Sequence, residues 1–121
     1  MFKFEKLNVW QSARIFIQTI YKLSQQFPSS ELYGLTSQIR RAAVSVALNI
    51  AEGCNSGSNK EFNRFLYLSS RSLDEVISCL YLAMDLEYIQ KTDFDVIYQA
   101  AENLGKQISG LKRFLAQSVS L

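Results

Sequence analysis

The stretch from Tyr33 to Gly53, YGLTSQIRRAAVSVALNIAEG, constrains the fold of this chain more than any other part of the sequence. Its middle, residues 42–51, contains no charged side chain. Apolar residues recur there at spacings of three and four, which is the period of an α-helix. The roughly opposite side, where a surface helix is usually polar, holds Val44, Ala47, Leu48 and Ala51. The stretch therefore predicts a helix over about residues 35–52 that is covered on two sides.

The same helical period appears in three more segments. With one proline and five glycines in 121 residues, the chain has few helix breakers, which favours long helices over a many-stranded sheet. We predict further helices over about residues 8–26, 59–86 and 92–118. Four amphipathic helices joined by short loops predict an all-α protein of a single domain, residues 1–121, folded as an antiparallel up-down-up-down four-helix bundle.

Short polar residues mark the beginnings of these helices, because their side chains can accept a free backbone N–H. The N-caps predicted in this way are Asn8, Ser58 and Thr92. Glu61, three residues after Ser58, completes the pattern of a capping box, and Gly53 suits a left-handed C-cap. Cations near the end of the fourth helix meet the negative end of its dipole; they are Lys106, Lys112 and Arg113.

A second apolar strip runs along both central helices, away from their main apolar faces. On the third helix it consists of Leu68, Cys79, Leu82 and Leu86. A bundle of this size has too few elements to wrap a helix completely, so contact with other copies of the chain explains the strip best. We therefore predict a homo-oligomer. The residues predicted to lie in its interface are Val44, Leu48, Leu68 and Leu82.

Trp10 and Tyr21 flank the main apolar face of the first helix, and they are interpreted either as the edge of the core or as subunit contacts.

Residues that carry chemistry are scarce. The chain has no histidine, which removes the commonest general base and the commonest metal ligand. Its two cysteines, Cys54 and Cys79, form no CxxC pair, and a structural zinc site takes about four Cys or His ligands. Cys54 is predicted to lie in the turn after the second helix. We predict that the protein is not an enzyme and that it has no catalytic residues, no metal and no cofactor.

The beginning of the chain, MFKFEKLNVW, carries charges where a signal peptide needs an unbroken apolar region. No apolar run approaches the roughly 20 residues that a membrane span requires. Two free thiols without a signal peptide are typical of a reducing compartment. The sequence therefore predicts a cytoplasmic protein without a membrane partner.

Basic residues form the remaining functional signal. The net charge is only +2, so attraction to nucleic acid needs a local patch. The candidates for binding an RNA or DNA backbone are Arg40, Arg41, Lys60, Arg64 and Arg71. Guanidinium groups bind phosphate through paired N–H donors. In the alternative interpretation these side chains pair with carboxylates on neighbouring turns, such as Glu61 and Glu75, or lie between subunits.

The block YGLTSQIRRAAVSVALNIAEG, followed by SNKEFNRFLYLSSRSLDEV, resembles the four-helix bundle family associated with intervening sequences in bacterial 23S ribosomal RNA genes. The opening KLNVWQSA and the later LEYI also fit, so the resemblance covers nearly the whole chain. Many members of that family have proline where this chain has Ala47. Alanine should leave the second helix unbroken, because proline would remove a hydrogen-bond donor and kink it.

The resemblance implies a bundle that assembles as a homopentamer. It also implies a relationship to the accessory proteins of diversity-generating retroelements, which are similar pentamers that bind nucleic acid through basic surfaces. Carried over by position, the motif residues are Arg40, Arg41, Asn49, Glu52, Lys60 and Arg64. Two functions follow as hypotheses: a non-enzymatic bundle that binds RNA or DNA, and a protein–protein scaffold that binds no nucleic acid.

Overall fold

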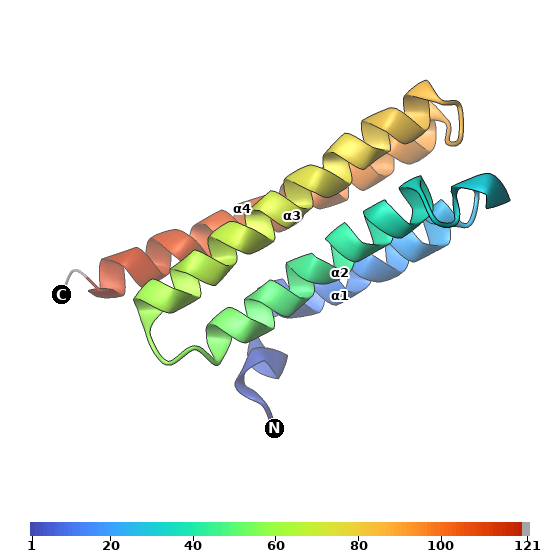
Figure 1. Cartoon of the computed structure of the whole chain (residues 1–121). Coiled ribbons are helices and arrows are strands. Elements are labelled where there is room, and N and C mark those ends of the chain that lie inside the picture. Colours follow the sequence, from blue (N-terminus) through green and yellow to red (C-terminus); the bar gives the residue numbers. More distant parts are fainter. Residues whose placement is uncertain (120–121) are drawn as a thin grey trace.

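The computed structural model describes residues 1–119 and is built from four long α-helices (Figure 1). The helices are α1 (Asn8–Ser24), α2 (Leu35–Cys54), α3 (Asn59–Asp85) and α4 (Lys91–Val119). Two short 3-10 helices, η1 (Lys3–Lys6) and η2 (Ser29–Glu31), precede α1 and α2. The described residues contain no β-strand. The predicted all-α fold class is therefore confirmed.

Each helix packs against two neighbours around a central core. α2 packs against α1 and α3, and α4 packs against the same two helices from the other side. α2 and α3 run antiparallel. The Ser69 hydroxyl donates to the backbone carbonyl of Val46, whereas Gly53, later in α2, lies against Phe62, which is earlier in α3. Figure 1 shows the four helices side by side, joined at their ends by short connections.

The core is made by the apolar faces that the helical period predicts. Its largest fully buried apolar side chains come from all four helices. They are Ile20 of α1, Ile39, Val46 and Ile50 of α2, Leu66, Val76 and Leu80 of α3, and Leu104 and Ile108 of α4. Burial of such side chains contributes about 1.5–3 kcal/mol each relative to exposure, so this core is the main source of the bundle's stability.

The helix ends confirm one predicted cap and correct three. The Ser58 hydroxyl accepts the N–H of Glu61 at 3.1 Å, so this N-cap is confirmed. The N-caps predicted at Asn8 and Thr92 are wrong, because α1 begins at Asn8 itself and α4 begins one residue before Thr92. The C-cap predicted at Gly53 is also wrong, since Gly53 lies inside α2 and the left-handed glycine of the connection is Gly57, with φ +91°.

Gly53 has a different role, which is to let α2 and α3 approach each other. A Cβ atom at this position would lie 2.7 Å from Cβ of Phe65 and 2.9 Å from Cδ1 of Phe62. Both distances are shorter than real Cβ contacts allow. The glycine is therefore required by packing between two helices and not by the turn that follows.

The second apolar face predicted for α2 is only partly exposed. Ala47 is buried, Val44 and Ala51 are half-buried, and Leu48 is 63% exposed. Ala47 lies seven residues after Arg40, hence on nearly the same side of the helix, and Arg40 contacts α1. This side of α2 therefore packs against α1 in the monomer, which corrects the prediction that Ala47 faces away from the bundle. α2 continues unbroken through Ala47, as expected.

Candidate nucleic-acid interface

The outer face of α3 carries four exposed side chains that share one side of the helix. Lys60, Arg64, Tyr67 and Arg71 follow one another at intervals of four, three and four residues, which places them in one stripe. All four are exposed, whereas Leu66 and Ser69 between them are buried. We call these four residues the α3 stripe.

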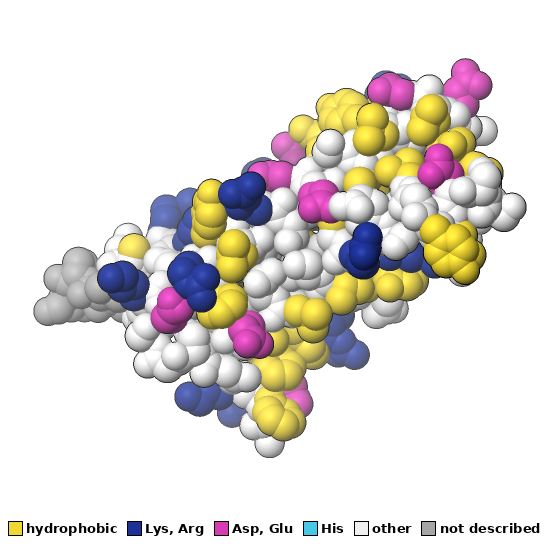
Figure 2. Space-filling model, viewed as in Figure 1, with side chains coloured by type: hydrophobic (Ala, Val, Ile, Leu, Met, Phe, Trp, Pro, Cys, Tyr) yellow, Lys and Arg dark blue, Asp and Glu magenta, His cyan; other side chains and the backbone are white. Residues whose placement is uncertain are grey.

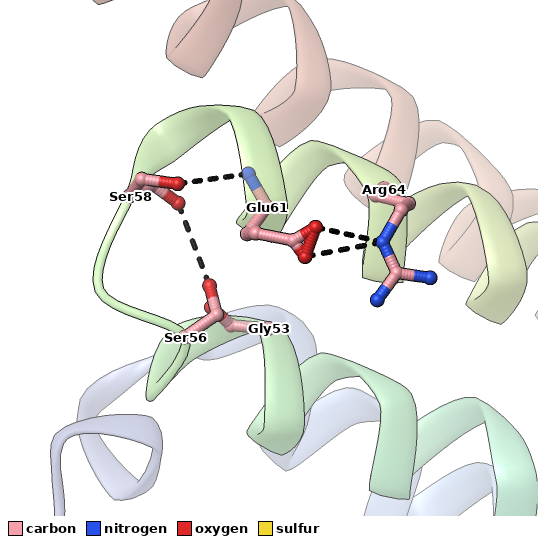
Figure 3. Close-up of polar contacts among 5 residues, drawn as sticks. All are labelled: Gly53, Ser56, Ser58, Glu61 and Arg64. Atoms are coloured by element: carbon pink, nitrogen blue, oxygen red, sulfur yellow. Dashed lines mark hydrogen bonds and ion pairs between the residues drawn. The ribbon is translucent and has the colours of Figure 1, made fainter.

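Arg64 is tied to the first turn of its own helix. Its Nε donates to both carboxylate oxygens of Glu61, at 2.8 and 3.1 Å (Figure 3). This hydrogen bond lowers the pKa of the Glu61 carboxyl and raises the pKa of the Arg64 guanidinium above its ordinary value. The alternative interpretation, pairing with a neighbouring carboxylate, therefore applies to Arg64. The pair is exposed, so it stabilises the bundle little.

Tyr67 and Arg71 form the C-terminal half of the stripe, and α4 adds a second cation to them. Cζ of Arg71 lies 5.9 Å from the centroid of the Tyr67 ring, and Nζ of Lys112 lies 5.4 Å from it. Neither cation takes part in an ion pair within residues 1–119. The Tyr67 side chain is 49% exposed. The three residues therefore form a mixed aromatic and basic surface.

Asn63 fixes the position of this part of α4. Its Nδ2 donates to the backbone carbonyl of Lys112 at 3.2 Å, which joins α3 to α4 one turn before Tyr67. Its Oδ1 is buried and has no hydrogen-bond partner within the described chain. The backbone beneath the Lys112 side chain is therefore held by a contact between two helices.

Arg40 has a different environment, because its guanidinium joins α2 to α1. Its Nε donates to the buried Ser24 hydroxyl at 2.8 Å, and its Nη2 donates to the Tyr21 carbonyl at 3.3 Å. Its Cζ also lies 4.7 Å from the centroid of the Tyr21 ring. Arg41 is exposed on α2. The five predicted basic residues are thus divided between two helices, and nucleic-acid binding by Arg40 and Arg41 stays a prediction.

A shallow groove of about 410 Å³ lies between α2 and α3, next to Arg71. Its floor is polar, because Nδ2 of Asn49 donates to the carbonyl and hydroxyl of Ser45, and the Ser72 hydroxyl donates to Ser45 Oγ. Gln38 and Glu75 are hydrogen-bonded across the same two helices. The motif residue Asn49 is therefore engaged within the bundle, while Glu52 is exposed.

The four residues predicted for a subunit interface do not form one continuous patch. Leu48 and Leu82 are 63% and 50% exposed, whereas Val44 and Leu68 are half-buried. Leu82 follows Leu68 by fourteen residues, which corresponds to about 21 Å along α3. Cys79, which the sequence placed on the same strip, is buried in the core. Subunit contact at these residues stays a prediction.

Charge and apolar surface are distributed unevenly over the molecule. Figure 2 shows several Lys and Arg side chains near the end of the bundle where α3 begins and α4 ends, and mostly hydrophobic and acidic side chains near the opposite end. The basic end contains the connection between α2 and α3, in which Figure 3 shows Ser56 and Ser58. Positive charge is therefore concentrated at one end of this face.

The two thiols lie in surroundings that favour their protonated form. Burial raises the pKa of both Cys54 and Cys79, and Cys54 is the last residue of α2 instead of lying in the turn. Within residues 1–119 no three Cys, Asp or Glu residues gather as they would around a metal ion. No helix of this part of the chain is long and apolar enough to cross a membrane.

These features define a small all-helical protein, a four-helix bundle with a basic and aromatic surface at one end. A model of the 23S rRNA-intervening sequence protein family matches residues 5–110. The chain therefore belongs to this family, which confirms the resemblance noted from its sequence. Comparison with curated proteins gave no significant match.

Proposed function

We propose that the protein is a non-enzymatic, homo-oligomeric bundle that binds RNA or DNA by its phosphate backbone, through the α3 stripe and Lys112. The observation that carries this proposal is the set of cations at the basic end that pair with no carboxylate. Lys60 and Arg71 are exposed, Lys112 is half-buried, and none of the three forms an ion pair within the described chain.

Unpaired cations are suited to phosphate binding for an energetic reason. A cation held by a carboxylate must give up that partner before it can bind phosphate at full strength, whereas a free cation exchanges only water and small ions. Each phosphate that a protein neutralises releases condensed counterions, which strengthens binding at low salt. Arg64 remains a weaker candidate because Glu61 occupies its Nε.

Three or four cations in one copy are too few for strong binding, so the proposal includes repetition of the site in an oligomer. The exposed Leu48 and Leu82 side chains support association between copies, and the family resemblance implies a pentamer. Light scattering at micromolar concentration should show an oligomer, and Leu48→Lys with Leu82→Lys should shift it toward the monomer. A stable wild-type monomer would contradict this part of the proposal.

Fluorescence anisotropy with a labelled oligonucleotide tests the binding itself. We expect affinity at low salt that falls steeply as salt is added. Reversing two charges of the stripe, Arg64→Glu with Arg71→Glu, should weaken binding on the order of 100-fold, because hydrogen bonds to charged groups contribute about 1.5–3 kcal/mol each. The proposal would be contradicted if binding is absent at low salt, or if the charge-reversed variant binds as tightly as wild type.

A protein–protein scaffold is the competing function, and the exposed apolar side chains favour it. Leu82 and Leu86 are each at least half exposed near the end of α3. If subunit contacts leave them uncovered, a partner protein could bind there. The scaffold predicts no affinity for nucleic acid at any salt concentration, so the anisotropy titration separates the two functions.

A further inference from the structure

Two cations lie over the ring of Tyr67 within residues 1–119. Arg71 approaches from the next turn of α3 and Lys112 approaches from α4, at 5.9 and 5.4 Å from the ring centroid. Tyr33 is 94% exposed and has no such neighbour within the described chain. Tyr67 therefore stands at the centre of the basic end of the molecule.

We propose that Tyr67 is a stacking platform for an unpaired base, with Arg71 and Lys112 binding the phosphates beside that base, so that the site prefers single-stranded nucleic acid to a duplex. This inference rests on the proposed function, since it assigns the class of nucleic acid that the same surface binds. The proposed ligand is single-stranded RNA or DNA, because both offer an unpaired base with an open π face next to a charged phosphate.

The chemistry of the cluster fits that ligand in both of its parts. Aromatic side chains within a basic surface are the recurring means by which proteins bind single strands, because every base offers a π face. A tyrosine that is half exposed can receive a base on its open surface. In a duplex the bases are paired and stacked inside the helix, so only the cations can contribute there. The preference for single strands over a duplex therefore comes from the Tyr67 ring, and not from the charges of Arg71 and Lys112.

The cluster is also held in place before any ligand binds. Tyr67 and Arg71 project from one continuous helix, and Asn63 Nδ2 holds the backbone carbonyl of Lys112 at 3.2 Å. Less conformational freedom is therefore lost on binding than at a surface loop. Flexible loops contribute no residue to this site, because α3 and α4 supply all of its side chains.

Other pairs of a cation and an aromatic ring in the bundle are used differently. Arg40 over Tyr21 is hydrogen-bonded to Ser24. Arg14 lies over Trp10, whose ring packs against Phe4 and the core. These contacts stabilise the fold. Only at Tyr67 do two cations that form no ion pair in the described chain meet a half-exposed ring.

The test compares single-stranded RNA, single-stranded DNA and a duplex of equal length, by anisotropy at one low salt concentration. Wild type should bind both single strands more tightly than the duplex. Tyr67→Leu should weaken single-strand binding about 5- to 150-fold, the range that corresponds to loss of one stacked base, and should leave duplex binding unchanged. Tyr67→Phe keeps the ring and should keep the affinity. Tyr33→Leu is the matched control and should have no effect.

The outcomes separate this inference from the proposed function. If wild type binds none of the three ligands, the proposed function fails and the inference fails with it. If wild type binds all three alike and Tyr67→Leu changes nothing, phosphate binding stands and the stacking platform is wrong. If Tyr67→Leu weakens single-strand and duplex binding equally, the ring does not discriminate and the inference is overturned. Circular dichroism melts of each variant establish that the bundle is folded.

Discussion

Arg40 and Arg71 each lie over a tyrosine ring, but the two contacts differ in what else the arginine binds. The first arginine joins two helices, and the second is left available to a ligand. Arg40 lies 4.7 Å from the Tyr21 ring and also donates two hydrogen bonds to α1. Arg71 lies 5.9 Å from the Tyr67 ring and makes no hydrogen bond or ion pair within the described chain. The partners other than the ring therefore decide which arginine can bind a ligand.

The difference extends to the helices that carry these residues. The side of α2 that holds Arg40 packs against α1, and Gly53 brings the end of α2 against α3. The α3 stripe points away from the core, and its ion pair is the exposed, local one between Arg64 and Glu61. Changes in these α2 contacts should alter stability, and changes in the α3 stripe should alter binding.

The largest expected effect on stability is that of Arg40→Ala. The substitution removes a hydrogen bond to a serine that is 2% exposed, a second bond to a carbonyl and a cation–π contact. We expect a loss of about 2–3 kcal/mol in the free energy of unfolding, measured by urea denaturation. The exposed neighbour Arg41 provides the matched control, and Arg41→Ala should change stability by less than about 0.5 kcal/mol. Equal losses of stability for the two substitutions would contradict a structural role of Arg40 that Arg41 lacks.

Gly53→Ala tests the close contact between α2 and α3 and should have the next largest effect. The new Cβ would overlap Phe65 and Phe62, and overpacking of this kind costs about 1–3 kcal/mol. Alanine favours a helix over glycine by about 1 kcal/mol, so a net loss of up to about 2 kcal/mol is expected in the same denaturation experiment.

The control for that experiment is Gly110→Ala on α4. There the nearest atom to a new Cβ is Nη2 of Arg113 at 3.9 Å, so the gain in helix propensity is unopposed. We expect Gly110→Ala to stabilise the protein by up to about 1 kcal/mol. A Gly53→Ala variant that is also stabilised would show that α2 and α3 do not need a glycine at this contact.

The smallest expected effect is a pH dependence at the beginning of α2. Glu31 accepts the Leu35 N–H at 3.0 Å and the Tyr88 hydroxyl at 2.7 Å, and these bonds, the backbone one first, lower the pKa of its carboxyl below 4.5. A lowered pKa means that the carboxylate stabilises the folded state above pH 4.5, and that this contribution disappears as pH falls through the lowered value.

Thermal melts of wild type and Glu31→Gln, from neutral pH to about pH 3, measure this contribution. The midpoint of wild type should exceed that of Glu31→Gln near neutral pH, and the difference should shrink as the solution becomes acidic. Other carboxylates affect both proteins and cancel in the difference. A difference that stays constant over the whole range would show that the Glu31 charge does not contribute.

The fold was largely predictable because the period of the apolar residues reports which side of each helix is buried. Ile39, Val46 and Ile50 follow that period and are all fully buried. Helix ends were less predictable, since Asn8 and Thr92 are good capping residues but both lie inside their helices. Asn8 is the first residue of α1, and Thr92 is the second residue of α4. Ser58 was predictable because Glu61 reinforces it, and its hydroxyl accepts the Glu61 N–H.

The candidate site was only partly predictable, because its geometry depends on which helices are neighbours. Lys60, Arg64 and Arg71 were found from their spacing along one helix. Lys112 was assigned to the dipole of α4, and nothing in its local sequence shows that it meets Tyr67. The contact of Arg40 with Ser24 was missed for the same reason, since it joins two residues of different helices that are sixteen positions apart in sequence.

The most direct test of the central claim is the salt dependence of single-strand binding by wild type, Arg71→Gln and Arg41→Gln. Affinity should fall linearly with salt on logarithmic axes, and each phosphate contact contributes about 0.7 to that slope. We expect Arg71→Gln to reduce the slope by about that amount for each copy of the site engaged and Arg41→Gln to leave it unchanged. No binding at low salt, or a slope that responds to Arg41→Gln and not to Arg71→Gln, would contradict the assignment of phosphate binding to the outer face of α3.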